Sequence, residues 1–291
     1  ENVLALEVVL PDGRVINTGT QAPKSASGYD LTRLFIGSEG TLGLITEIKL
    51  KLYGQPASIK SASCVFENIS DAVQTVILAI QSGIQLARVE LLDEVQMQGM
   101  NNYNKDLSFP EKPHLFIEFH GSELSTTEQV EDFKSISDEF GAYDFKWATK
   151  TEDRNRLWKA RHDAYWAGKS LWPQASSLVT DCCVPISSLA SCILKTKEAI
   201  DESDLLAPLV GHVGDGNYHL LILFDGTTRD GLKRAKELAG RVNEIALSFG
   251  GTITGEHGVG TGKKNFMYLE HGNAWNLMGD IKKLFDPKNI M

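Results

Sequence analysis

The chain is short of cysteine, of long apolar runs and of basic residues, and each shortage excludes a class of protein. Its net charge of −9 argues against a nucleic-acid partner, because a surface that binds phosphates must be basic. No apolar run approaches the roughly 20 residues that a membrane-spanning helix needs. We therefore expect neither a nucleic-acid partner nor a transmembrane segment.

The four cysteines form no C-x-x-C pair, and two of them, Cys182 and Cys183, are adjacent. This arrangement suits neither a disulfide framework nor a zinc ribbon, so we expect reduced thiols that are mostly buried. A phosphate-binding loop is missing as well. Gly255 and Gly260 have the spacing of the G-x-x-x-x-G-K motif, but Thr261 follows in place of lysine.

The chain begins at Glu1 and enters a strand pattern at once, over residues 3–10. No leader or linker stands before this strand, and the chain ends abruptly at Met291. We therefore expect a piece of a longer protein, in which no targeting signal can be recognised from an internal start.

Apolar periodicity predicts an α+β fold with an antiparallel sheet covered by helices. Residues 1–52 alternate short strands with glycine turns, and the glycines within residues 37–43 favour backbone packed against a flat ligand or another segment. A first set of elements has strands near residues 59–65, 86–91, 115–119 and 145–148 and helices near 70–83 and 127–141. A second, looser set has strands near 178–184, 206–213 and 219–224 and helices near 189–200 and 232–249. The first set follows the ferredoxin-like order.

Two glycine-packed segments, residues 211–219 and 255–258, concentrate titratable side chains. A hairpin would bring His212 and His219 together, and Glu256 could supply a third ligand. Two imidazoles and a carboxylate suit a zinc-like ion and leave an open position, as in a catalytic site. Core histidines beside a tight turn are an equally good interpretation of this spacing alone.

His257 follows Glu256 directly, and neighbouring side chains of an extended loop point to opposite sides. His257 could therefore face a substrate and accept a proton near neutral pH. The alternative is a loop histidine that is exposed to water.

A helix is predicted over residues 156–166, with Trp158, Arg161 and Tyr165 on one face. An arginine between aromatic side chains suits bidentate capture of a carboxylate. In the alternative arrangement the aromatic rings pack in the core and Arg161 extends to the surface.

Four motifs occur in order, at residues 28–31, 36–43, 211–217 and 255–260. Together they resemble the FAD-linked oxidases of the vanillyl-alcohol oxidase type, in the branch that acts on D-2-hydroxy acids. Residues 158–162 and 180–186 are similar to those of the mitochondrial D-lactate dehydrogenases that reduce cytochrome c. The resemblance covers essentially the whole chain.

This resemblance implies three regions. Residues 1–52 match the C-terminal part of a PCMH-type FAD-binding domain, residues 53–250 match a substrate or cap domain with ferredoxin-like halves, and residues 251–291 match a segment that returns to the flavin. The loop that cradles the FAD pyrophosphate would precede Glu1. The chain alone is therefore not expected to hold FAD tightly.

The resemblance also implies roles for single residues. His212, His219 and Glu256 match the ligands of a divalent metal, which we expect to be Zn²⁺. Asn217 matches a polar residue beside the substrate, His257 the acceptor of the hydroxyl proton, and Arg161 the arginine that holds the substrate carboxylate. The positions that match a loop along the flavin are Gly37, Ser38, Gly40, Thr41, Gly43 and Ile45.

The implied reaction is the FAD-dependent oxidation of D-lactate to pyruvate in mitochondria, with electrons passed to cytochrome c. Relatives that oxidise D-2-hydroxyglutarate carry a lysine shortly before the position of Asp181, where this chain has Val179 and Thr180. A monocarboxylate substrate is therefore favoured. D-2-hydroxyglutarate or glycolate as substrate, a zinc-dependent hydrolase and an inactive fragment stay open as alternatives.

Overall fold

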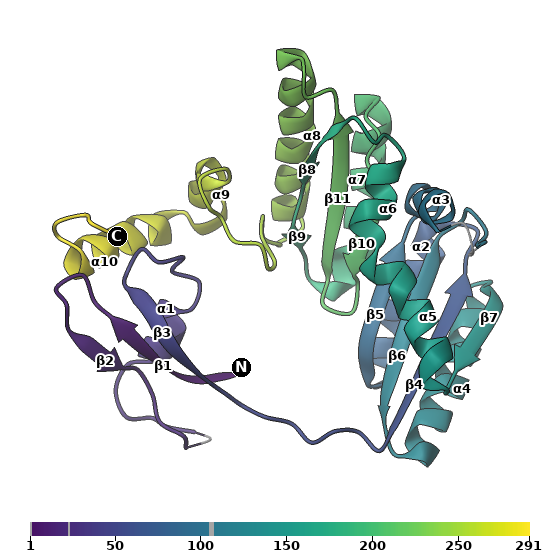
Figure 1. Cartoon of the computed structure of the whole chain (residues 1–291), viewed down its shortest axis with the longest axis horizontal. Coiled ribbons are helices and arrows are strands. Elements are labelled where there is room, and N and C mark those ends of the chain that lie inside the picture. The colour runs from purple at the N-terminus through teal and green to yellow at the C-terminus, as the bar shows by residue number, and fades with distance from the viewer. Residues whose placement is uncertain (1, 23, 105–107) are drawn as a thin grey trace. The chain divides into compact units, whose positions relative to one another are not determined.

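The structure is a computed structural model that describes residues 2–22, 24–104 and 108–291, apart from the side chains of residues 156, 157 and 160. The chain divides into two compact units. The smaller unit consists of residues 1–55 and 258–291, and the larger unit consists of residues 56–257 (Figure 1).

A three-stranded antiparallel sheet in the order β2-β1-β3 forms the centre of the smaller unit. Its elements are β1 (Val3–Val9), β2 (Val15–Asn17), α1 (Leu31–Phe35), β3 (Leu44–Leu50), η2 (Lys264–Phe266), α9 (Met267–His271) and α10 (Asn273–Phe285). The ring of Phe35 is fully buried and meets the ring of Phe285 edge-on, with centroids 5.7 Å apart. This contact joins the two ends of the chain within one core.

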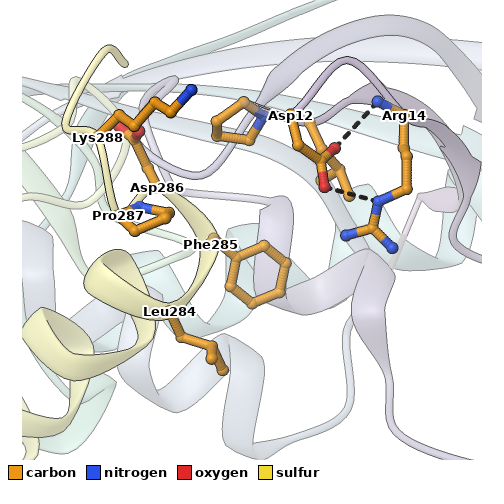
Figure 2. A pocket seen from close by; sticks show the side chains of 9 residues that line it. Asp12, Arg14, Leu284, Phe285, Asp286, Pro287 and Lys288 are labelled. Carbon is orange, nitrogen blue, oxygen red and sulfur yellow. Dashed lines mark hydrogen bonds and ion pairs between the residues drawn. The ribbon is translucent and has the colours of Figure 1, made fainter.

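A surface hollow of about 360 Å³ lies in the smaller unit, between the turn after β1 and the residues that follow α10 (Figure 2). The paired side chains of Asp12 and Arg14 line one side of it, and Pro287 and Lys288 line the other. None of the residues to which the sequence assigns a function lines this hollow.

The larger unit is built on an antiparallel sheet in the order β7-β4-β6-β5-β10-β11-β8, with β9 paired to β11. Its strands are β4 (Ser58–Val65), β5 (Leu86–Leu92), β6 (His114–Gly121), β7 (Tyr143–Ala148), β8 (Ser176–Val179), β9 (Cys182–Cys183), β10 (Leu209–His212) and β11 (Asn217–Phe224). Its helices are α2 (Ile69–Gln81), α3 (Glu94–Tyr103), α4 (Glu123–Glu139), α5 (Thr151–His162), α6 (Ala164–Ser170), η1 (Ile186–Ser188), α7 (Leu189–Ser203) and α8 (Arg229–Ser248).

The sheet consists of two similar halves. In the first half, β4 to β7, the strand order β7-β4-β6-β5 with α2 and α4 as connections is ferredoxin-like. The second half, β8 to β11, repeats this order, and a single bridge between Cys183 and Thr252 stands in place of its last strand. The halves join where β10 pairs with β5. The predicted α+β class, the antiparallel sheet and the ferredoxin-like halves are confirmed.

Four helices cover one face of this sheet because their apolar positions recur at helical spacing. In α2, the side chain of Asn68 caps the first turn by accepting from the Asp71 amide, and Gly83 follows the helix end at φ +82°. Val73 and Val76 of this helix are fully buried in the core that α2, α4, α7 and α8 form with the sheet. Burial of such a side chain contributes about 1.5–3 kcal/mol to stability.

The opposite face of the sheet is more polar, since side chains alternate along each strand. Glu90, His212 and His219 lie on this face, since their strand neighbours Val89, Val213 and Tyr218 belong to the core on the other face. The helices α5 and α6 cross the polar face (Figure 1). A smaller apolar cluster under α3, α5 and α6 includes Met97 and Trp158. The polar face is where the predicted functional side chains gather.

Two predicted elements differ from the structure. The strand expected over residues 178–184 is interrupted at Thr180 and Asp181, so that β8 and β9 are separate. The helix expected over residues 156–166 breaks at Asp163 into α5 and α6. The helices α3, α9 and α10 lie in segments for which the sequence predicted no element.

Candidate active site

The hairpin of β10 and β11 places His212 and His219 on one face of the sheet. The register pairs His212 with Asn217, and His219 points to the same side because it follows two residues later. The turn between the strands needs Gly216, which adopts φ +80° and leaves no room for a Cβ beside the Val184 carbonyl. The two imidazole rings meet edge-on with centroids 5.5 Å apart.

Thr180 interrupts the neighbouring strand and directs its carbonyl toward His219. The Thr180 hydroxyl, in place of the carbonyl, accepts from the Leu220 amide at 2.9 Å. The Thr180 carbonyl oxygen lies 3.1 Å from Nδ1 of His219. A carbonyl can only accept, so Nδ1 carries the hydrogen and Nε2 keeps the lone pair of the ring. The broken strand therefore fixes the tautomer of His219.

Glu90 fixes the tautomer of His212 in the same way. Its Oε1 lies 2.8 Å from Nδ1 of His212, and an ionised carboxylate only accepts. When the His212 ring is neutral, its Nε2 therefore also keeps a lone pair. In their neutral forms both histidines present an unprotonated nitrogen to the same side.

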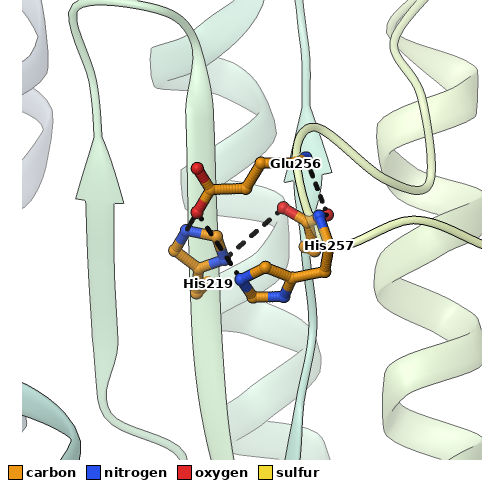
Figure 3. A group of neighbouring side chains, drawn as sticks. His219, Glu256 and His257 are labelled. Carbon is orange, nitrogen blue, oxygen red and sulfur yellow. Dashed lines mark hydrogen bonds and ion pairs between the residues drawn. The ribbon is translucent and has the colours of Figure 1, made fainter. Parts of the chain in front are cut away.

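One oxygen of Glu256 stands opposite these nitrogens. Glu256 Oε1 lies 3.6 Å from Nε2 of His212, 3.3 Å from Nε2 of His219 and 3.5 Å from Nε2 of His257. The His257 ring stacks on the His219 ring with centroids 4.8 Å apart (Figure 3). When both rings are neutral, their two lone pairs and the carboxylate oxygen repel one another at these distances, and a cation among them would remove the repulsion.

Asp181 holds the loop that carries Glu256 and His257. Its Oδ2 accepts from the Thr254 hydroxyl at 2.6 Å and from the amides of Glu256 and His257 at 3.0 and 2.7 Å. Burial opposes the ionisation of Asp181, but these hydrogen bonds and one from Asn217 outweigh it and lower the pKa of the carboxyl to about 2. Asp181 is therefore an ionised anchor at neutral pH.

The two histidines are tuned in opposite directions. The hydrogen bond that His212 donates to Glu90 raises the pKa of His212 and outweighs the effect of burial. Burial lowers the pKa of His219, and its contacts with Thr180 and Asp181 offset only part of this shift. A neutral imidazole is the form that binds a metal. At neutral pH His219 is in that form.

The donor set fits a divalent cation of the zinc type. Imidazole nitrogens and a carboxylate are its preferred ligands, and a ligating histidine commonly donates its other N–H to a carboxylate or carbonyl, as His212 and His219 do here. A second group, with ligand atoms within 4.8 Å of one another, consists of Asp181, His219, Glu256 and His257 and does not include His212. Asp181 is a poorer candidate ligand than His212, because both of its carboxylate oxygens already accept hydrogen bonds. The assignment of the metal to His212, His219 and Glu256 stays a prediction.

Asn217 lies beside this group and is almost fully buried. Its Nδ2 donates to Oδ1 of Asp181 at 3.0 Å and to the Cys182 carbonyl at 2.9 Å, which fixes the orientation of the amide. Oδ1 of Asn217 has no hydrogen-bond partner among the described residues. An orphaned buried acceptor is costly unless a ligand supplies a donor.

Arg161 is held against the same face of the sheet. Its Nε donates to Oε2 of Glu90 at 2.9 Å, and its side chain is 17% exposed. The helix breaks at Asp163, and Tyr165 beyond the break contacts Ser177 and Trp166. Trp158 is buried and donates to Ser61. The expectation that these aromatic rings flank Arg161 stays a prediction.

The residues predicted to lie along the flavin belong to the smaller unit. Gly37 and Gly40 are exposed at φ +81° and +76°, with open space where a Cβ would stand. Residues 38–41 form a turn that contains Gly40, closed by hydrogen bonds from the Thr41 amide and hydroxyl to the Ser38 carbonyl. The backbone of this turn is thus free to approach a flat ligand closely.

The remaining two positions are inside this unit. Gly43 is buried where a Cβ would meet Val8 and the Val9 carbonyl, and Ile45 packs against the apolar cluster of β1 and β3. Glu39, between the exposed glycines, accepts from the amides of Val259 and Gly260. Gly43 and Ile45 are therefore part of the packing beneath the turn and not of its exposed surface. The flavin role of all six positions stays a prediction.

The sequence analysis did not identify two residues of this site, Glu90 and Asp181. Glu90 is a lone carboxylate in an apolar strand, between Val89 and Leu91, and a charge in such a place is a signal for a buried partner. Asp181 had no such signal, because its role depends on the backbone of a loop 75 residues later.

Comparison with known proteins assigns a family. The family model described as FAD linked oxidases, C-terminal domain, matches residues 55–291. A probable mitochondrial D-lactate dehydrogenase of Danio rerio is 45% identical over 100% of this chain and 59% of its own length. The mitochondrial D-lactate dehydrogenase [cytochrome] of Arabidopsis thaliana is 45% identical over 100% of this chain and 51% of its own length.

A more distant relative is the glycolate oxidase subunit GlcD of Bacillus subtilis, 35% identical over 99% of this chain and 62% of its own length. The chain thus spans about half to three fifths of the length of the curated relatives that it matches.

Solved structures share the fold. The 4-ethylphenol oxidase of Gulosibacter chungangensis has a TM-score of 0.72 at 18% identity, covering 98% of this chain and 64% of its own. p-Cresol methylhydroxylase has a TM-score of 0.73 at 16% identity, covering 99% of this chain and 64% of its own. Within the described residues, no helix has the length and apolar character to cross a membrane.

Proposed function

The chain belongs to the family of FAD linked oxidases, C-terminal domain, and we propose that it forms the substrate-binding part of an enzyme that oxidises D-lactate to pyruvate. One observation carries this proposal. Nε2 of His212, Nε2 of His219 and Nε2 of His257 all lie within 3.6 Å of the same oxygen of Glu256. The similarity to D-lactate dehydrogenases of Danio rerio and Arabidopsis thaliana supports the substrate.

In this proposal Arg161 binds the carboxylate of the substrate. A guanidinium pairs with a planar carboxylate through two parallel hydrogen bonds, and only Nε of Arg161 is engaged by Glu90. The terminal nitrogens are then the donors to the substrate. This arrangement fixes the orientation of a 2-hydroxy acid by its one charged end.

His257 accepts the proton of the 2-hydroxyl group. Its ring is 47% exposed and stacks on His219, so it stands at the open side of the proposed metal site. Asn217 offers Oδ1 as an acceptor for the same hydroxyl before the proton leaves. Loss of the proton to Nε2 of His257 prepares C2 to release a hydride.

His212, His219 and Glu256 would hold a divalent metal, which supplies Lewis-acid polarisation of the hydroxyl oxygen when it is bound. FAD, near Gly37, Ser38, Gly40, Thr41, Gly43 and Ile45, supplies the acceptor for the hydride when it is bound. The name of the Arabidopsis thaliana relative supports cytochrome c as the final acceptor, and the names of both plant and fish relatives support a mitochondrial location.

The choice of a monocarboxylate rests on the residues before Asp181. Val179 is 38% exposed and uncharged, and the Thr180 side chain is committed to the Leu220 amide. No cation stands at these two positions to bind a second carboxylate. Glycolate is the second candidate, because the Bacillus subtilis relative is a glycolate oxidase subunit. Family membership favours either flavin-dependent oxidation over zinc-dependent hydrolysis.

The test is steady-state turnover by the full-length flavoprotein with His257→Ala. We expect kcat with D-lactate to fall by roughly 10²–10⁴-fold, because general-base help is lost. His120→Ala is the matched control, since His120 lies in the same unit but pairs with Glu118 rather than with Glu256. D-lactate, glycolate and D-2-hydroxyglutarate are compared as substrates with the unaltered protein. An undiminished kcat in the His257 variant removes this residue from the mechanism.

A further inference from the structure

Glu90 joins two residues to which separate roles are proposed. Its Oε1 accepts from Nδ1 of His212 at 2.8 Å, and its Oε2 accepts from Nε of Arg161 at 2.9 Å. His212 belongs to the proposed metal site, and Arg161 is the proposed anchor of the substrate carboxylate. Each oxygen of one side chain therefore serves a different part of the site.

The sheet places Glu90 at this point. β10 pairs with β5 so that Gly211 lies opposite Leu91, and the next step of the antiparallel register brings His212 opposite Glu90. Glu90 comes from the first half of the sheet and His212 from the second. Arg161 reaches Glu90 from α5, which crosses the same face.

Because both side chains are largely buried, the contact between Glu90 and Arg161 is costly to break. The Glu90 side chain is 9% exposed and that of Arg161 is 17% exposed. A carboxylate that is removed from water to this extent requires its partners, because nothing else compensates its lost hydration.

We propose that Glu90 is a positioning residue that holds His212 in its metal-binding tautomer and Arg161 in a fixed orientation. The metal and the substrate carboxylate then take their positions from one shared carboxylate. This inference rests on the proposed function of His212 and Arg161, and it adds a residue that acts through both.

The substitution Glu90→Gln separates the two contacts by simple hydrogen-bond chemistry. Both partners of Glu90 donate, and a glutamine side chain has one acceptor oxygen and one donor nitrogen. The charged guanidinium of Arg161 forms the stronger hydrogen bond, so the oxygen stays with Arg161. The amide then donates to Nδ1 of His212, whose hydrogen moves to Nε2. The neutral side chain therefore cannot accept from both partners.

The first measurement is the dissociation constant of Zn²⁺ from this chain, determined by isothermal titration calorimetry. We expect Glu90→Gln to weaken Zn²⁺ binding roughly 10–100-fold, as is typical when the partner of a metal-binding histidine is lost. The second measurement is the ¹⁵N spectrum of the imidazoles in the metal-free chain. We expect Nδ1 of His212 to carry the hydrogen in the unaltered chain and Nε2 to carry it in the variant.

Glu118→Gln is the matched control. Glu118 is a buried carboxylate on the neighbouring strand β6 and contacts Ser61, His120 and Arg88, away from the metal group. Its variant should bind Zn²⁺ like the unaltered chain. His219→Ala tests the metal site itself, and should abolish the binding.

The outcomes separate the inference from the proposed function. Equal Zn²⁺ binding by the unaltered chain and the His219→Ala variant would contradict the proposed metal site. The tautomer of His212 would still decide whether Glu90 positions this ring. Loss of binding in His219→Ala with full binding in Glu90→Gln would overturn the inference and leave the metal site standing. If Glu90→Gln does not fold, an Nε2–H tautomer of His212 in the unaltered chain overturns it equally.

Discussion

Asp181 shows how one buried side chain can position the residues of a site without taking part in the reaction itself. Its carboxylate accepts two backbone amides and one hydroxyl from a single loop, and also accepts from the Asn217 amide. The loop between Thr254 and His257 contains no helix or strand of its own. Its conformation therefore depends on these hydrogen bonds.

We expect Asp181→Asn to loosen this loop. An asparagine that accepts the amides of Glu256 and His257 would direct its NH₂ group at the NH₂ group of Asn217, and one donor would lose its partner. Leaving a buried donor unsatisfied costs about 1–3 kcal/mol. The expected result is a lower free energy of unfolding and faster hydrogen exchange at the amides of residues 256 and 257.

Asp286→Asn is the comparison for this prediction. Asp286 likewise accepts two backbone amides, from Ile290 and Met291, but in the smaller unit. This variant should leave the exchange of residues 256 and 257 unchanged. Slow exchange of both amides in Asp181→Asn would show that the loop holds its shape without the carboxylate.

The sequence indicated the chemistry of single residues better than their partners. The pairing of His212 with His219 follows from local spacing across a short turn, and the structure places the two rings together. Glu90 and Asp181 act through contacts that are 122 and 75 residues apart in sequence. Such contacts exist only once the sheet is assembled, so a single sequence does not reveal them.

At the scale of elements, the hairpin of β10 and β11 depends on one glycine. Gly216 adopts φ +80°, and an added Cβ would lie 2.1 Å from the Val184 carbonyl oxygen. That carbonyl cannot move freely, because the Val184 amide itself donates to the Gly216 carbonyl at 3.0 Å. Gly216→Ala therefore combines backbone strain with a steric clash.

We expect Gly216→Ala to destabilise the chain by more than the roughly 1–3 kcal/mol of a strained φ alone. Gly83→Ala measures the strain without the clash, since Gly83 has φ +82° and open space around it. Denaturant unfolding of both variants gives the two costs. Equal destabilisation would mean that the turn relaxes around the new methyl group.

Helices and strands with clear apolar periodicity were predicted correctly, as α2, α4, α7 and α8 show. The predicted helix over residues 156–166 failed because aromatic and charged residues continue through Asp163 without a proline or glycine to mark the break. The predicted strand over residues 178–184 failed because the Thr180 hydroxyl takes over a backbone hydrogen bond. Side chains that replace backbone contacts leave no mark in the periodicity.

At the scale of the whole molecule, the stability of the chain depends on the protonation of His114. This residue is 2% exposed at the start of β6, stacks on Phe116 and lies 2.7 Å from the Lys112 carbonyl. Burial lowers the pKa of His114 from its ordinary 6.5 to about 4, and the hydrogen bond to Lys112 offsets only part of this shift. The native protein therefore resists a proton that the unfolded chain accepts.

The sign of the effect follows from this difference. Above pH 6.5 both states leave His114 neutral, and between pH 6.5 and about 4 only the unfolded state binds the proton. The free energy of unfolding should therefore fall as the pH is lowered through this range, by roughly 3 kcal/mol from this residue. His114→Phe keeps an aromatic ring in place and should flatten the dependence. Denaturant unfolding at a series of pH values measures it, and an equally steep dependence in the variant would contradict the assignment.

The join between β5 and β10 has a consequence for how the two halves of the sheet depend on each other. Two halves with one strand order stand edge to edge, yet the first contributes Glu90 and the second contributes His212. Neither half holds both partners of this contact. A shift of one half along the shared edge would therefore separate the pair, even if each half kept its own fold.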